Sequence, residues 1–271
     1  MEIITKESYI QGKDRDQDLC EDGLLIEKDF VAVVDGVTST GDVLFNGMRS
    51  GRFARNVILE RLKEINLAEF GSIGLMKDLT KCIQQKTKEI YPDLEHKYYP
   101  RASFIIFNRI KGEIWNYGDC QCMVSGILMN HDKYVDKLNA EIRAFQIECA
   151  LKNGMTLHEI MEKDIGRNEI MENLKKKYMF ENQNGPYGYP VLNGYSFNPA
   201  MLRTYKIYEG TEIVLASDGY PYLKDSLQES EECLRELLIS DPLCYKKYKS
   251  TKGIRYGNYS FDDRTYWRGT Y

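Results

Sequence analysis

Two short apolar runs that each end abruptly in Asp-Gly limit the folds open to this chain. The first is Phe30-Val-Ala-Val-Val before Asp35-Gly36, and the second is Ile213-Val-Leu-Ala-Ser before Asp218-Gly219. Continuous runs of this length and β-branched composition are typical of buried strands. A carboxylate placed where a buried strand breaks into a loop is costly unless a cation pairs with it, and the glycine lets the chain bend sharply. The alternative is an ordinary Asp-Gly turn.

Short turns between neighbouring predicted strands indicate antiparallel pairing. Strands are expected at 23–26, 30–34, 102–108, 113–117, 121–128, 202–208 and 212–215, with short turns at 109–112, 118–119 and 209–210. Connections this short cannot make the crossover that parallel strands need. We therefore expect an α+β fold with antiparallel sheets.

Helical periodicity fills most of the remaining sequence. Helices are expected at about 46–65, 73–90, 136–180 and 225–239. Residues 1–20 are polar, with an exposed loop at 12–18, and 181–200 form an irregular loop rich in Gly, Asn, Pro and Tyr. Because there are no repeats and no linker, we expect one domain over residues 1–271.

Composition excludes several classes of protein. The net charge of −4 argues against a nucleic-acid-binding protein, whose basic surface would dominate the balance. The seven scattered cysteines are typical of a reducing compartment. No apolar run has the length of a transmembrane segment or the form of a signal peptide. We expect a soluble, cytoplasmic monomer that does not bind membranes.

Further carboxylates stand at predicted strand ends or turns, as Asp35 and Asp218 do. They are Asp119, Asp262 (or Asp263) and the pair Glu21-Asp22. Oxygen ligands in this number suit Mg²⁺ or Mn²⁺, and no His or Cys spacing indicates zinc. Solvated turn aspartates and an acidic strand end are the alternative interpretation.

The order of these motifs resembles that of the metal-dependent type 2C (PPM) Ser/Thr protein phosphatases. The motifs are Glu21-Asp22, Val33-Val34-Asp35-Gly36, Gly118-Asp119, Ala216-Ser217-Asp218-Gly219 and Asp262-Asp263-Arg264-Thr265. Each motif is short, but together they span nearly the whole chain in one order. The resemblance implies two packed antiparallel sheets flanked by helices.

The resemblance also implies a role for each acidic position. Asp35 would bridge two Mn²⁺ or Mg²⁺ ions, the Gly36 carbonyl would bind one of them, and Asp218 and Asp262 would complete the other shell. Glu21 and Asp22 would hold metal-bound waters, and Asp119 would lie near a weaker third ion. Asp35, Asp218 and Asp262 would thereby support attack on phosphorus by a hydroxide that bridges the two ions.

Three departures from the family pattern affect the prediction. Many members have a His after the first Asp-Gly as a general acid, whereas Val37 and Thr38 follow here. The family's phosphate-binding Arg usually lies a few residues before the Glu-Asp pair; Arg15 and Lys13 are the candidates here, with a loose spacing to Glu21. A rival alignment places Asp16-Gln17-Asp18 on the Glu-Asp pair. Residues 129–200 form a long insert where the family carries its variable flap.

The leading functional prediction is a phosphomonoester hydrolase acting on phosphoserine or phosphothreonine of a protein substrate. One alternative is a non-catalytic binding module with the same fold. Another is a phosphatase of a small phosphorylated metabolite, for which the insert would form the pocket.

Overall fold

The computed structural model describes residues 3–38, 41–129, 131 and 133–271. Its strands form two five-stranded sheets, in the orders β1-β10-β9-β6-β7 and β2-β3-β4-β5-β8. The strands are β1 (Ile4–Gln11), β2 (Asp22–Ile26), β3 (Phe30–Gly36), β4 (Ala102–Asn108), β5 (Glu113–Tyr117), β6 (Gln121–Val124), β7 (Ile127–Met129), β8 (Arg203–Lys206), β9 (Glu212–Ala216) and β10 (Arg264–Thr270). Every pairing between these strands is antiparallel.

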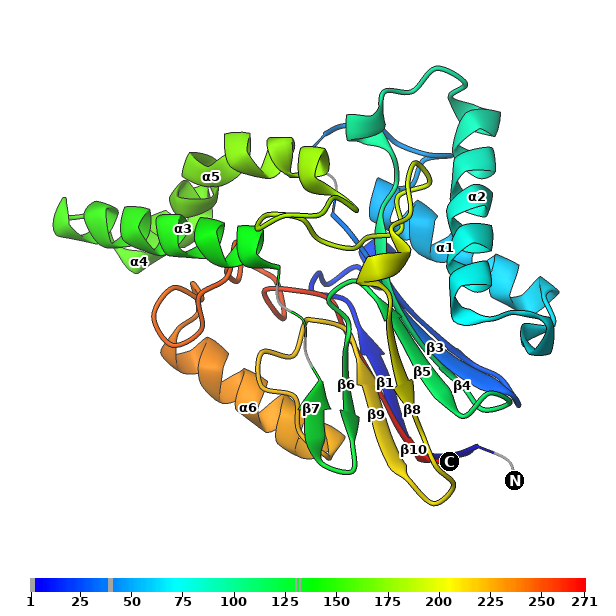
Figure 1. The fold of residues 1–271 in the computed structure, drawn as a ribbon. Coiled ribbons are helices and arrows are strands. Elements are labelled where there is room, and N and C mark those ends of the chain that lie inside the picture. Colours follow the sequence, from blue (N-terminus) through cyan, green and yellow to red (C-terminus); the bar gives the residue numbers. More distant parts are fainter. Residues whose placement is uncertain (1–2, 39–40, 130, 132) are drawn as a thin grey trace.

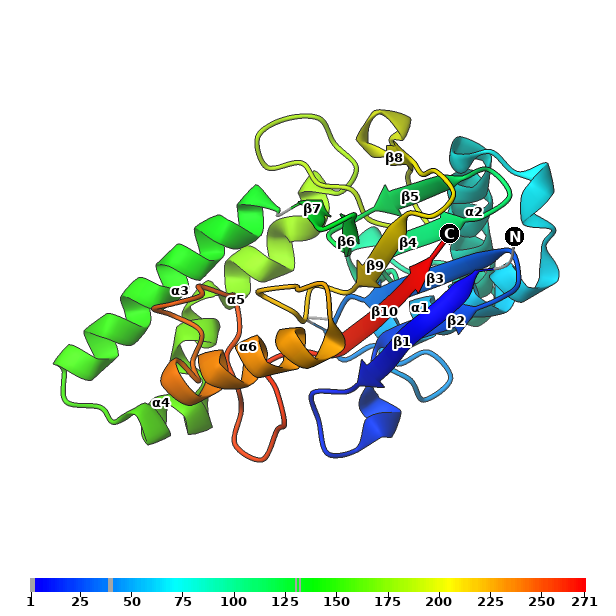
Figure 2. The ribbon, with the colours of Figure 1, turned by 90° about the horizontal axis from the view of Figure 1, so that it is seen from below.

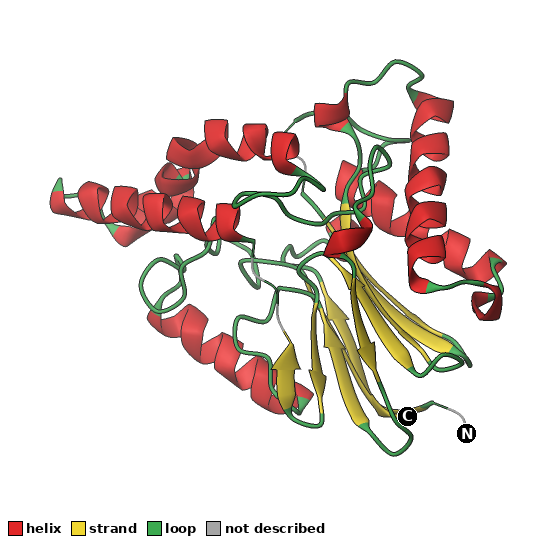
Figure 3. Ribbon diagram, in the orientation of Figure 1, coloured by secondary structure: helices red, strands yellow, loops and turns green. Residues whose placement is uncertain are grey.

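Helices cover the outer faces of both sheets (Figures 1 and 3). The α-helices are α1 (Ser50–Glu64), α2 (Ser72–Ile90), α3 (Tyr134–Lys152), α4 (Leu157–Lys163), α5 (Ile165–Lys176) and α6 (Leu227–Ser240). Helices α1 and α2 lie beside the β2–β5 sheet, and α6 lies beside the sheet that contains β9 and β10 (Figure 2). This confirms the predicted α+β fold of two packed antiparallel sheets between helices.

Alternate residues of β3 show why its apolar run is continuous. Val31 and Val33 pack between the sheets against residues such as Leu215 and Trp267. Ala32 and Val34 face the opposite way and pack with residues of α1 and α2. Because both faces of the strand are buried, no position is left for a polar side chain until Asp35.

Two of the expected hairpins are wrong, because the chain passes there from one sheet to the other. Strand β5 pairs with β4 and β8, whereas β6 pairs with β7 and β9. Likewise β8 belongs to the sheet that contains β5, and β9 belongs to the sheet that contains β6. The turn at 118–119 therefore bridges the layers. Gly118 has a φ of 137°, and a Cβ there would lie 2.4 Å from Ser103 Oγ, so the tight passage requires glycine.

The expected strand at 121–128 is two strands, β6 and β7. Ser125 and Gly126 between them have φ values of 49° and 78°. Two successive positive φ angles are the signature of a tight hairpin turn whose twist matches the strands.

The sequence predicted no strand in the polar N-terminal segment, but residues 4–11 form the edge strand β1. Its residues are mostly exposed, and β1 pairs with β10 along its length. No local apolar pattern predicted this strand, because it is formed by pairing with β10 at the C-terminal end of the chain.

The region between β7 and β8 contains α3, α4, α5 and the irregular loop that follows them. Figure 1 shows α3 and α5 beside the sandwich, on the side where the loop after α6 also lies. Among the described residues no helix combines the length and apolar character needed to cross a membrane.

Candidate metal centre

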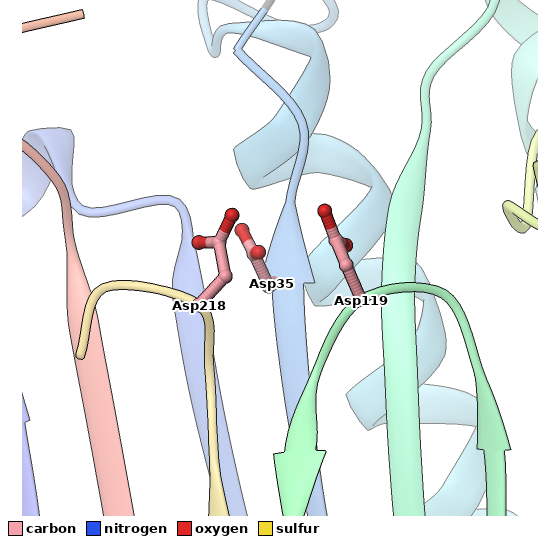
Figure 4. Close-up of side chains that lie close together, drawn as sticks. All are labelled: Asp35, Asp119 and Asp218. Carbon is pink, nitrogen blue, oxygen red and sulfur yellow. The ribbon is translucent and has the colours of Figure 1, made fainter. Parts of the chain in front are cut away.

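Three aspartates from separate parts of the chain meet at one end of the sandwich (Figure 4). Asp35 is near the end of β3, Asp119 is in the β5–β6 passage, and Asp218 follows β9. One carboxylate oxygen from each lies within 4.8 Å of the others. The site thus joins both sheets, and it brings together three of the residues singled out in the sequence.

The electrostatics of this trio favour a bound cation. Burial raises the pKa of Asp35 well above its usual range, and repulsion from neighbouring aspartates adds to the rise. The pKa of Asp218 is raised well above its usual range for the same two reasons. Buried carboxylates that repel one another hold their charge only if a cation compensates it.

Asp22 extends the acidic cluster from the neighbouring strand. It lies opposite Asp35 in the β2–β3 pairing, and Thr265 Oγ1 donates a hydrogen bond to its Oδ2 over 2.9 Å. Burial and the nearby charge of Asp263 raise the pKa of Asp22 to about 8. Asp22, and not a residue of the rival Asp16-Gln17-Asp18 alignment, is the residue that lies opposite Asp35.

Glu21 supplies an oxygen that still needs a partner. Its Oε2 accepts a hydrogen bond of 2.6 Å from Thr38 Oγ1, while the buried Oε1 has no hydrogen-bond partner among the described residues. A Cβ added to Gly51 would lie 2.7 Å from this Oε1 and 2.8 Å from the Gly36 carbonyl oxygen. Gly51 therefore packs closely against Gly36, where a side chain would clash with both oxygens. Carboxylate and carbonyl oxygens are the ligands that a hard divalent cation prefers.

Asp262 lies apart from the trio and is paired with lysines. Its carboxylate contacts Lys252, and Lys13 Nζ is 3.5 Å from its Oδ1. Burial raises the pKa of Asp262, but the attraction of Lys252 and Lys13 outweighs this, so that the net pKa is lowered. Asp262 nevertheless lines the same cavity as the trio.

The two candidates for a phosphate-binding side chain lie in different places. The Lys13 ammonium is among the acidic groups, 3.1 Å from Asp263 Oδ2 and 3.8 Å from Glu21 Oε2. The Arg15 guanidinium instead donates through Nε to the Gly257 carbonyl over 3.0 Å and lines a separate groove beside α6. Only Lys13 is placed beside the acidic cluster.

Two lysines at the site were not predicted from the sequence. Lys133 Nζ lies 2.7 Å from Asp119 Oδ2, and the Lys133 side chain is buried. Although burial raises the pKa of Asp119, this ammonium outweighs the effect and the net pKa is lowered. Lys252 forms the corresponding ion pair with Asp262 and likewise lowers the pKa of that carboxyl. Neither lysine belongs to a local motif that could have revealed it.

A cavity of about 540 Å³ opens above the acidic groups. Its floor includes the Asp35–Asp119–Asp218 trio and Asp262, and its walls come from α3, α5 and the loop after α6. No histidine lines it among the described residues. Of the aromatic residues in the 184–195 loop, Tyr189 does line it, but burial raises the pKa of its hydroxyl, which makes it a poor proton donor.

The fold is that of the metal-dependent type 2C Ser/Thr protein phosphatases. The similar solved structures include the catalytic domain of the serine/threonine protein phosphatase PstP in complex with two manganese ions, at a TM-score of 0.51 and 14% identity over 99% of this chain and 98% of that one. The Mycobacterium tuberculosis phosphatase PstP/Ppp has the same TM-score of 0.51 at 14% identity, over 100% and 99% of the two chains. A bacterial serine phosphatase also gives 0.51 and 14%, over 97% and 96%. No protein-family model and no curated protein sequence matches the chain.

Proposed function

We propose that this protein is a metal-dependent phosphomonoester hydrolase that removes phosphate from phosphoserine or phosphothreonine in proteins. The observation that carries the proposal is the trio of convergent aspartates, with carboxylate oxygens within 4.8 Å, in a fold shared with protein phosphatases. The unpartnered Glu21 Oε1 beside the Gly36 carbonyl supports the same conclusion. The seven cysteines are all free, which supports action in a reducing compartment such as the cytoplasm.

The proposed cofactor is a pair of Mn²⁺ or Mg²⁺ ions. When bound, such ions activate water and neutralise charge on the phosphoryl oxygens. Asp35 would serve both ions, because its carboxylate lies between those of Asp218 and Asp119 (Figure 4). Glu21 and Asp22 would orient water, with Thr38 and Thr265 fixing their carboxylates.

Lysines complete the proposed division of roles. Of the two predicted candidates, Lys13 is better placed than Arg15 to meet a phosphate oxygen, because it lies beside the acidic groups. Asp262 would join the metal shell only if Lys252 and Lys13 release it. At Asp119 the buried ammonium of Lys133 already supplies the positive charge that a weaker third ion would bring.

Hydrolysis of phosphoserine and phosphothreonine peptides with and without Mn²⁺ tests the proposal. We expect turnover that requires the metal and is abolished by Asp218→Asn. Asp225→Asn is a matched control, because this exposed aspartate follows the same strand but lies outside the cavity. Turnover that persists in Asp218→Asn would refute the assignment of the site.

A non-catalytic binding module with the same fold is the second candidate. The pairing of Asp262 with two lysines favours it, because a carboxylate already held by ammonium groups is a weaker metal ligand. Calorimetry decides between the two: demonstrable Mn²⁺ binding without turnover of p-nitrophenyl phosphate or any phosphopeptide would support the binding module.

A further inference from the structure

The walls of the cavity above the acidic trio are strongly basic. Ten lysine and arginine side chains line the cavity, against six of aspartate and glutamate. Four of those six are the floor aspartates already described. The other two, Asp136 and Glu181, form ion pairs with Lys177 and Arg101. Lys97, Lys175 and Lys249 pair with glutamates that lie outside the lining. If metal ions neutralise the floor, the excess of positive charge therefore rests on the wall cations that form no such pair.

Two of the wall cations form no ion pair among the described residues. Arg167 on α5 and Lys247 in the loop after α6 both line the cavity, and neither has a carboxylate within 4 Å in the part of the chain that the structure describes. Burial lowers the pKa of Arg167, which is the expected response of a half-buried cation without a close partner. Asp164 attracts the Arg167 guanidinium without outweighing the effect of burial. A cation in a cavity that forms no ion pair favours an anionic ligand.

The basic loop is held in place by arginines of the preceding helices. Arg143 of α3 is buried and donates from Nη1 to the carbonyls of Leu243 and Cys244, over 2.7 and 3.3 Å, and of Ser250, over 3.2 Å. Arg167 donates to the Thr251 carbonyl over 3.0 Å. These bonds fix residues 243–252 against α3 and α5, so the lysines of the loop line a built wall.

The cations extend from the floor of the cavity to its rim. Lys133 is buried beside Asp119, whereas Lys175, Lys247 and Lys249 are exposed at the outer edge. A peptide advances about 3.3 Å per residue when extended, so residues next to a phosphoserine on the floor can reach the rim. A small molecule bound at the floor would leave the rim cations unused.

We propose that these basic walls select phosphoprotein segments that carry further negative charge, as acidic or additional phosphorylated residues, next to the phosphate that is removed. The inference rests on the proposed phosphatase function. Lys247 and Arg167 are the side chains that read the second charge. Because Lys247 is at an exposed rim, its contribution is screened by salt.

The test compares two phosphoserine peptides of equal length, one flanked by glutamates and a second phosphoserine, the other by glutamines and serine. With saturating Mn²⁺ and low salt, we expect kcat/KM to favour the acidic peptide by about tenfold or more, as several contacts of up to about fivefold each would give. The preference should shrink as salt is added. Equal kcat/KM for both peptides would overturn the inference.

Matched variants locate the effect. Lys247→Gln should reduce the preference by up to about fivefold, and Arg167→Gln should also reduce it. Lys246→Gln is the control, because Lys246 is the adjacent exposed lysine but lies outside the cavity lining. An equal loss in Lys246→Gln would mean that overall charge, not this wall, is responsible. Thermal melts verify that Arg167→Gln folds. Lys247→Gln changes an exposed side chain, so its result does not depend on whether Arg167→Gln is folded.

Two further measurements separate failure of this inference from failure of the proposed function. Turnover of p-nitrophenyl phosphate with no peptide preference would overturn only the inference. Without any turnover the proposed function fails, and fluorescence anisotropy of peptide binding then decides whether the wall still prefers the acidic peptide. A small sugar bisphosphate hydrolysed with a higher kcat/KM than either peptide would overturn the assignment to phosphoproteins.

Discussion

Replacing Asp22 by Asn should stabilise the metal-free protein and weaken its response to metal. Asp22 has its pKa raised to about 8 from an ordinary value of 3.8, chiefly by burial. At pH 7 the folded protein therefore holds a proton on Asp22 that the unfolded chain releases. Because Asp22 must take up that proton when the chain folds, the folded state is less stable at pH 7. Asparagine has the same shape and no proton to take up, so the variant avoids this cost.

The size of the effect follows from the two pKa values. A pH of 7 lies about 3 units above the pKa of the carboxyl in the unfolded chain, and each unit corresponds to about 1.4 kcal/mol. The stability gain is therefore at most about 4 kcal/mol. With an unfolding entropy of about 2 cal/mol/K per residue over 271 residues, this raises the Tm by about 7 °C.

The sign of the pH dependence is a further check. A carboxyl whose folded pKa is raised contributes stability below its unfolded pKa and loses it as pH rises toward the folded value. The advantage of Asp22→Asn should therefore be small at pH 4, grow through neutral pH, and level off above about pH 8.

Metal should narrow the difference in Tm between the two proteins. Mn²⁺ at a hundred times its Kd stabilises the parent by about 2.7 kcal/mol per ion, or about 5 °C. Loss of a group that supports a metal shell typically weakens affinity by about ten- to a hundredfold. In Asp22→Asn most of the Mn²⁺-induced rise in Tm should then disappear.

Differential scanning calorimetry of chelated and Mn²⁺-loaded protein at pH 4, 7 and 8.5 measures all of these quantities. Asp225→Asn serves as the control for the chemical change alone, since this side chain is exposed. The reasoning is refuted if Asp22→Asn lowers the Tm of the metal-free protein at pH 7, or if its effect does not change with pH.

Three other predictions concern metal binding and catalysis. Asp35→Asn should cause a severe loss of Mn²⁺ affinity in titration calorimetry, because Asp35 lies between the other two carboxylates (Figure 4); unchanged affinity would place the site elsewhere. Mn²⁺ binding should release protons, and its affinity should rise with pH, because the raised pKa values of Asp35 and Asp218 keep protons on the metal-free site. Calorimetry in buffers of different ionisation enthalpy measures the release, and identical heats would contradict it. An activated aryl phosphate, whose leaving group needs no proton, should be hydrolysed about 10²- to 10⁴-fold faster than a phosphoserine peptide. The reason is that no histidine lines the described cavity to protonate the serine alkoxide. Equal kcat values with a bell-shaped pH profile would reveal an acid that we have not identified.

Local sequence was sufficient for the parts of the fold that depend on neighbouring residues. The apolar run at Phe30–Val34 predicted a buried strand because a strand with both faces covered has no place for polar residues. The Asp-Gly pairs at its end and after β9 marked two of the three aspartates that meet at the candidate metal centre. Gly118-Asp119 was recognisable as a turn, since glycine and aspartate are favoured where the chain bends.

The sheet to which each strand belongs was not readable in the same way. A short turn looks the same in sequence whether it closes a hairpin or carries the chain between layers, as at 118–119 and 209–210. The difference lies in hydrogen bonds to distant partners, such as β8 with β5 and β1 with β10. For β1 these long-range bonds make a strand out of a polar segment.

Charge pairing at the site depended on tertiary structure still more strongly. Motif order treated Asp262 as equivalent to Asp35 and Asp218, yet Asp262 is held by Lys252 and Lys13. Lys133 and Asp119 are distant enough in the chain that no local pattern links them, and they meet in a buried ion pair. A carboxylate's availability to a metal depends on which charges surround it within a few ångströms. That surrounding is assembled only when both sheets, the insert and the loop after α6 come together.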